Sequence, residues 1–128
     1  MILVTFAVRI DTAAEWFAIE SSLESGVPLV VANLMRLQSQ ASMILLEEDL
    51  EAVRQTAARA KGWGIHTEPL MSMSCRRPAK ALLRLARERD PGLVVFGPDR
   101  LRTSDRRYQR AARTVRDDLD CLVWTAGE

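Results

Sequence analysis

Five short apolar runs, separated by stretches with helical periodicity, limit what this 128-residue sequence can fold into. The runs are rich in β-branched residues and lack a helical period, which is typical of strands buried on both faces of a sheet. They lie at residues 2–10, 29–35, 65–73, 93–96 and 121–126. Since a helical stretch joins each run to the next, we expect parallel strands and right-handed crossovers. The pattern predicts one α/β domain over residues 1–128, a five-stranded parallel sheet with helices on both faces.

Four amphipathic stretches supply the predicted helices. The first follows Asp11, which has N-cap chemistry, and ends near Gly26. Its inward positions are expected to be Trp16 or Phe17, Ile19 and Leu23, and its outward positions Glu15, Glu20 and Glu24. The second has the clearest apolar stripe, formed by Met43, Leu46, Leu50, Val53, Ala57 and Ala60. The third begins at Pro78. The fourth covers about 104–118, with an expected buried face of Tyr108, Ala111, Ala112, Val115 and Leu119.

Composition and charge exclude several classes of protein. With 48% apolar and 27% charged residues, the chain is globular. No run approaches the roughly 18 apolar residues of a membrane helix, and the opening ILVTFAV lacks the flanks of a signal peptide. We therefore expect a cytoplasmic protein without membrane insertion. Residues 1–60 carry four arginines against eight acids, and residues 61–128 carry fourteen basic residues against nine acids. The overall balance of +1 argues against a nucleic-acid binder.

The order of these elements, together with several local motifs, resembles the universal stress protein family. The motifs are GLVVFG in the fourth run, RRPAKALLRLARERDP before it and CLVWTA at the end. Asp11 matches an acidic residue after the family's first strand, Pro78-Ala79 a proline-alanine helix start, and Cys121 a cysteine that begins the last strand. The resemblance covers nearly the whole chain. Together with the periodicity, it implies the strand order 3-2-1-4-5.

In a doubly wound sheet, ligands bind beyond the carboxyl ends of the strands, at the point where the strand order reverses. In the order 3-2-1-4-5 this switch point lies between the first and fourth strands, whose loops begin at Asp11 and Gly97. The resemblance implies a nucleotide or anion site there, with ATP or AMP as the ligand. Its candidate residues are Asp11, Thr12, Ala32, Gly97, Pro98, Arg100 and Arg110.

The glycine motif of the family's nucleotide-binding members is missing from this chain. Those members resemble one another in a Gly, two residues, a Gly, nine residues, and a Gly followed by Ser or Thr. Here Gly97 matches the first position, Arg100 stands at the second, and Arg110-Ala111 or Gln109-Arg110 stands at the last pair. Glycine is absent from Pro98 to Leu122. Since glycines let backbone amides approach a phosphate closely, we expect no bound nucleotide.

Asp11 and the arginines each have two interpretations. Asp11 can contact a ribose or a metal, as the resemblance implies, or it can cap the first helix, which we favour. The arginines between 100 and 116 can hold an anion through side-chain forks. Alternatively they form a solvated helix face, which the helical spacing of Arg106, Arg110 and Arg113 favours.

No catalytic or metal-binding constellation is present in the sequence, so we do not expect an enzyme. His66 is the only histidine and has no neighbouring ligands at metal-binding spacing. Cys75 lies beside two arginines, which would lower the pKa of an exposed thiol and permit a redox role. Cys121 is expected in the core.

The last run, CLVWTA, becomes a sheet edge in the implied order. It carries no lysine, proline or inward charge of the kind that protects an edge from pairing. In the family that it resembles, this strand commonly pairs across a two-fold axis. We therefore expect a homodimer through Leu122, Val123 and Trp124.

Together these features favour a small stress-response or regulatory protein that acts by interaction. Two alternatives stay open: a nucleotide- or anion-binding sensor with a site rebuilt from arginines, and a soluble regulatory domain associated with a membrane transporter.

Overall fold

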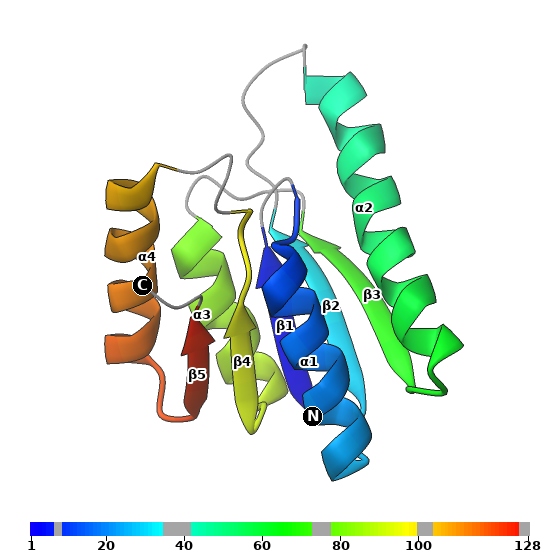
Figure 1. Cartoon of the computed structure of the whole chain (residues 1–128). Helices are drawn as coiled ribbons and strands as arrows, with labels where there is room; N and C mark the ends of the chain where they lie inside the picture. Colours follow the sequence, from blue (N-terminus) through cyan, green and yellow to red (C-terminus); the bar gives the residue numbers. More distant parts are fainter. Residues whose placement is uncertain (7–8, 35–41, 73–77, 100–103, 126–128) are drawn as a thin grey trace.

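A parallel five-stranded sheet lies at the centre of the structure, a computed structural model that describes residues 1–6, 9–34, 42–72, 78–99 and 104–125. The strand order is β3-β2-β1-β4-β5, which confirms the predicted order (Figure 1). Strands and helices alternate along the chain. Their bounds are β1 (Ile2–Phe6), α1 (Thr12–Ser25), β2 (Leu29–Leu34), α2 (Ser42–Gly62), β3 (Thr67–Ser72), α3 (Pro78–Arg89), β4 (Leu93–Phe96), α4 (Asp105–Asp118) and β5 (Leu122–Thr125).

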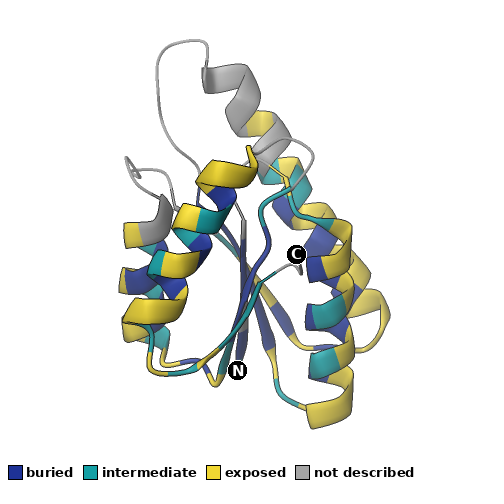
Figure 2. Cartoon of the chain, turned by 60° about the vertical axis from the view of Figure 1, so that its left-hand side comes forward, coloured by how far each residue is buried: buried dark blue, intermediate teal, exposed yellow. Residues whose placement is uncertain are grey.

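Two helical layers cover the two faces of the sheet. On one face, α1 and α2 pack against a buried cluster that includes Val4, Val31 and Val95. On the other face, α3 and α4 pack against Val30 and Val94, which directly precede Val31 and Val95 in β2 and β4. Because successive side chains of a strand point to opposite faces, β2 and β4 each contribute to both layers. Figure 2 shows the buried residues between the layers and the exposed ones on the outer helical surfaces.

The first strand ends earlier than the sequence predicts. Its pairing with β2 runs from Ile2 opposite Leu29 to Phe6 opposite Asn33. Ile10, predicted within the strand, instead forms an isolated antiparallel bridge with Pro98. The chain has therefore left the sheet direction before Ile10, and this change positions the loop after β1 against the loop after β4.

Helix α1 follows the prediction at Ile19 and Phe17, which face the core, and departs from it at other positions. The side chains that it buries are Ala14, Glu15, Ala18, Ile19 and Ser22. Leu23 and Trp16 are about half exposed, so the predicted core role of Leu23 was wrong. Glu15 was predicted to point outward but is buried, because it pairs with Arg59 of α2 at 2.6 Å. Phe17 packs on Trp124 of β5, with ring centroids 5.0 Å apart.

The other helices follow their predicted patterns. In α2, Val53, Ala57 and Ala60 are buried, while Met43 and Leu46 lie outside the described side chains. In α4, Tyr108, Ala112 and Val115 are buried, and Ala111 and Leu119 pack against them. Among the helices as far as they are described, none is long and apolar enough to cross a membrane.

Candidate functional site

The loops after β1 and β4 are joined by backbone hydrogen bonds at the switch point. The amide of Gly97 donates to the carbonyl of Thr5 at 2.8 Å, and the amide of Asp11 donates to the carbonyl of Gly97 at 2.8 Å. The amide of Asp99 donates to the carbonyl of Arg9 at 3.0 Å, beside the Ile10–Pro98 bridge. The amides of Gly97, Asp11 and Asp99 are therefore bonded within the protein at this place and are not open to a ligand.

Asp11 is the N-cap of α1, which confirms the capping interpretation. Its Oδ2 accepts hydrogen bonds from the amides of Ala13 at 3.1 Å and Ala14 at 3.3 Å. These amides begin the helix and have no partner within it, so the carboxylate satisfies them and also meets the positive end of the helix dipole. Thr12 is the first residue of the helix and is exposed.

Gly97 lies where a side chain of another element comes close, and that side chain belongs to the protein itself. A Cβ atom on Gly97 would stand 2.7 Å from the Cβ of Ala14 in α1, far inside van der Waals contact. Real Cβ atoms essentially never approach so closely. The missing side chain therefore lets α1 pack against the end of β4. This packing role explains the glycine without a phosphate group.

The remaining candidate residues lie at different places in the fold. Ala32 is fully buried in β2, in register with Thr5. Pro98 is partly buried in the bridge to Ile10. Arg110 lies on the exposed side of α4, and Arg100 lies outside the described residues. The structure thus brings Asp11, Thr12, Gly97 and Pro98 together, with Ala32 beneath them in the sheet.

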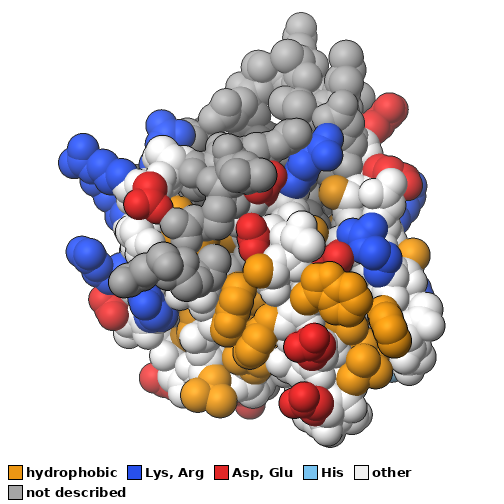
Figure 3. Space-filling view, viewed as in Figure 1, with side chains coloured by type: hydrophobic (Ala, Val, Ile, Leu, Met, Phe, Trp, Pro, Cys, Tyr) orange, Lys and Arg blue, Asp and Glu red, His pale blue; other side chains and the backbone are white. Residues whose placement is uncertain are grey.

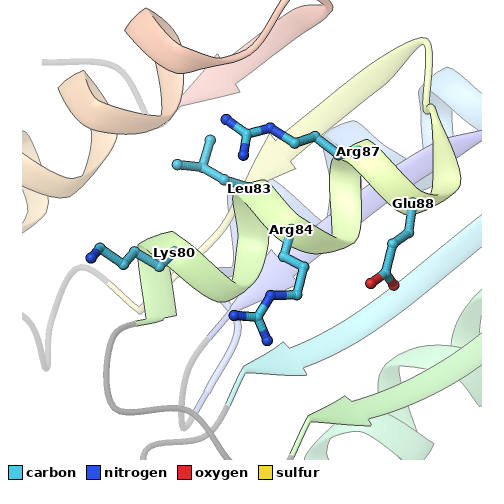
Figure 4. Close-up of a pocket in the computed structure, with 5 residues that line it drawn as sticks. All are labelled: Lys80, Leu83, Arg84, Arg87 and Glu88. Carbon is cyan, nitrogen blue, oxygen red and sulfur yellow. The ribbon is translucent and has the colours of Figure 1, made fainter.

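The arginines of α4 form an exposed helix face, as the spacing predicted. Arg106, Arg110 and Arg113 are all exposed, and the helix buries the side that carries Tyr108 and Ala112. The basic residues of α3 are similarly open. Lys80, Leu83, Arg84, Arg87 and Glu88 line a hollow of about 480 Å³. In Figure 4 the charged ends of these side chains spread in different directions, so they do not converge on one anion.

Two buried polar side chains were missed by the sequence analysis. Thr5 of β1 is almost fully buried, and its Oγ1 has no hydrogen-bond partner among the residues that the structure describes. Asn33 of β2 is fully buried near the end of its strand. The available signal was a polar residue inside an otherwise apolar run, in ILVTF and in LVVANL. Both residues lie near the carboxyl ends of central strands.

Among the described residues, Cys121 and His66 form no reactive cluster. Cys121 is partly buried just before β5, and burial raises the pKa of its thiol, as expected for an unreactive cysteine. Cys75 lies outside the described residues. His66 is exposed at the amino end of β3, away from the switch point. Within the described ranges, no group of three potential metal ligands comes together.

Comparisons by sequence find no matching family model and no significantly similar curated protein. Solved structures do match. A universal stress protein family member from Burkholderia pseudomallei superposes with a TM-score of 0.72 at 19% identity, over 97% of this chain and 96% of that one. The universal stress protein from Archaeoglobus fulgidus in complex with dAMP has a TM-score of 0.67 at 19% identity, over 98% and 97% of the two chains.

A third match is a universal stress protein family protein from Arabidopsis thaliana with AMP bound. Its TM-score is 0.63 at 14% identity, over 98% of this chain and 90% of that one. All three superpositions span nearly the whole of both chains, and the strand order is the one that the sequence implied. This chain therefore has the fold of the universal stress proteins.

Proposed function

We propose that this chain is a small cytoplasmic stress-response or regulatory protein that acts by interaction, as a homodimer, and that it is not an enzyme. One observation carries the proposal: the groups at the switch point are already used to hold the fold together. The Asp11 carboxylate caps α1, the space beside Gly97 holds Ala14, and three backbone hydrogen bonds join the loops. A site of this kind offers few groups to a nucleotide.

The proposed dimer interface is the free edge of β5. This strand pairs with β4 on one side only, and it is the last strand of the sheet. Leu122 is 75% exposed, and Val123 and Trp124 are partly exposed. An apolar edge without charges is a template for another strand. Pairing with the same edge of a second copy would satisfy its backbone groups around a two-fold axis.

Sedimentation velocity at high micromolar concentration tests the dimer. The wild type is expected to be dimeric, and Val123→Lys monomeric, because a lysine on each copy would bring like charges together at the axis. Leu122→Lys repeats the test at a position exposed enough to leave folding intact. Leu23→Lys is the control, the same substitution at an exposed leucine away from the edge, with 46% of its surface accessible. A monomeric wild type would overturn this part of the proposal.

The second candidate is a nucleotide-binding sensor. It is favoured by the matching structures from Archaeoglobus fulgidus and Arabidopsis thaliana, which are complexes with dAMP and with AMP. The sequence after Gly97 argues against a nucleotide-binding sensor, because it has no further glycine until Gly127. Calorimetric titration with ATP and with AMP, in the presence of Mg²⁺, separates the two functions. We expect no saturation up to about 1 mM, equivalent to a binding free energy near −4 kcal/mol. Tighter binding would favour the sensor.

A further inference from the structure

An aromatic surface on the side of α1 that faces away from β5 has no role in the proposed dimer. Four large apolar side chains are strongly exposed in the described part of the chain, and three of them lie here: Trp16 and Leu23 of α1, and Trp63 after α2. The rings of Trp16 and Trp63 meet edge to face with centroids 6.1 Å apart. Leu23 follows Trp16 by two helical turns on the same side of α1. We call these three residues the Trp16 patch.

A recess adjoins the Trp16 patch. It has a volume of about 400 Å³ and shares Leu23 with the patch. Its lining combines apolar side chains with polar groups, and the segment Gly64 to His66 that forms one wall directly follows Trp63 in the chain. The full lining is Ser22, Leu23, Gly26, Val27, Pro28, Gly64, Ile65 and His66. The surface thus offers an edge-to-face pair of indoles beside a hollow large enough for an aliphatic side chain.

The charge around the Trp16 patch is negative. Helix α1 carries three acids and no basic residue. Arg59 neutralises Glu15 through hydrogen bonds from Nε and Nη2, which leaves Glu20 and Glu24 exposed on the same helix. Figure 3 shows two acidic side chains between hydrophobic side chains on this face. Lys61 is the exposed base near Trp63, and His66 lies at the rim of the recess.

The opposite layer has the opposite charge. Helix α3 carries four basic residues against one acid, and α4 carries five against three. A second copy could therefore approach the acidic patch with α4. However, the exposed side of α4 is made of arginines and lacks an apolar side chain to fill the recess. A partner needs both positive charge and apolar anchors.

We infer that the Trp16 patch docks a basic amphipathic helix of a partner protein. An apolar side chain of that helix would enter the recess beside Leu23, and its Lys or Arg groups would lie over the indoles and toward Glu20 and Glu24. The inference rests on the proposed function, because it names a partner class for a protein that acts by interaction. It uses a surface other than the β5 edge, so each can fail without the other.

The test uses a synthetic amphipathic peptide of leucine and lysine, about 16 residues long, which forms roughly four helical turns. Its twin has glutamate at every lysine. Binding is followed by tryptophan fluorescence in the Trp124→Phe variant, in which only Trp16 and Trp63 emit. We expect a saturable blue shift with a dissociation constant on the order of 10 μM, as for small transient interfaces. The glutamate twin should bind at least roughly tenfold more weakly.

Substitutions then locate the contact. Trp63→Ala and Trp16→Ala should each weaken binding roughly tenfold, as aromatic anchors do. Glu20→Gln with Glu24→Gln should weaken it several-fold and reduce its dependence on salt. Leu122→Ser, which removes the fourth exposed apolar side chain, should leave the affinity unchanged.

Three outcomes would overturn the inference. The first is equal binding of the two peptides, and the second is unchanged affinity in Trp63→Ala. The third is an emission maximum of the free protein that shifts with its own concentration, since a second copy would then cover the patch. Loss of the dimer in Val123→Lys with peptide binding intact would leave the inference standing and show that the two surfaces are independent.

Discussion

The switch point between β1 and β4 and the free edge of β5 are separated by two strands of the same sheet and differ in what their atoms do. At the switch point, polar groups and close contacts are internal: Asp11 bonds amides of α1, and Gly97 packs on Ala14. At the edge, Leu122 has three quarters of its surface exposed. The residues with a functional appearance thus have structural partners, and a plain aliphatic residue has none in the monomer. Residue type alone is therefore a weak guide to which surface of the fold binds a partner.

The largest expected effect tests whether Gly97 is structural. Gly97→Val should destabilise the protein by about 3 kcal/mol, since its Cβ would stand 2.7 Å from the Cβ of Ala14 and neither group can swing away. Urea denaturation followed by circular dichroism measures the loss. If Gly97→Val unfolded at the wild-type midpoint, the contact would not matter, and a role in ligand approach would again be the better explanation of the glycine.

A compensating change supplies the control. Ala14→Gly alone should cost about 1 kcal/mol through helix propensity. Combined with Gly97→Ala it should recover stability relative to the sum of the two single effects, because it removes the atom that the new Cβ meets. Additive effects would contradict this account of the contact.

The next effect separates capping from charge at Asp11. Asp11→Ala should cost about 1 kcal/mol, because the amides of Ala13 and Ala14 lose their acceptor. Asp11→Asn should keep most of that stability, since asparagine caps helices about as well. Thermal and urea melts of both variants measure this. A ligand contact that needs the carboxylate would instead make the asparagine variant deficient in binding while it stays stable.

A smaller effect is expected at the edge, and it sharpens the contrast. Leu122→Ser should change the free energy of unfolding of the monomer by no more than about 0.5 kcal/mol, because the side chain is exposed. The same change should weaken self-association. Chemical denaturation at low concentration and sedimentation at high concentration separate the two quantities. A large loss of monomer stability would mean that Leu122 belongs to the core.

The fold could be predicted from the sequence because the sheet demands a repeated pattern. Each buried parallel strand needs an apolar run and each crossover a helical period, and both signals survive in a single sequence. The buried face of α1 was predicted only in part: Ile19 and Phe17 pack in the core as expected, but Ala14 and Ala18 also face the sheet while the larger Trp16 and Leu23 face outward. Hydrophobicity alone would place the larger Trp16 and Leu23 toward the sheet. Close packing against β4 requires small residues there, and that requirement is visible only in three dimensions.

The site was predicted in part. The position of the switch point follows from strand order, and Asp11 and Gly97 do meet there. The contacts that each residue makes could not be predicted, because a carboxylate that caps a helix and one that binds a ligand look identical in sequence. The buried Thr5 was missed although it is a polar residue in an apolar run, because threonine also has a strong strand preference and so does not by itself mark a site.

The other edge of the sheet, β3, gives the smallest expected effect and a reference for β5. This edge carries Pro69, which has no amide hydrogen to offer a further strand. It also carries Glu68, whose two carboxylate oxygens accept hydrogen bonds from Arg89 at 2.8 and 3.1 Å. These bonds hold the pKa of Glu68 below its ordinary value. One edge is therefore protected by charge and proline, and the other is bare.

The sign of the pH effect follows from that lowered pKa. The unfolded chain takes up the proton at Glu68 before the folded one does, so the ion pair contributes stability above the ordinary pKa of the carboxyl, and this contribution is lost as the pH falls through the folded pKa. Glu68→Gln should lower the melting temperature at pH 7 by only a few degrees, since the pair is exposed to water. The difference from wild type should shrink as the pH falls through the folded pKa of Glu68. It should leave the oligomeric state unchanged, because Pro69 still blocks the β3 edge; new association in this variant would mean that Glu68, rather than Pro69, protects it.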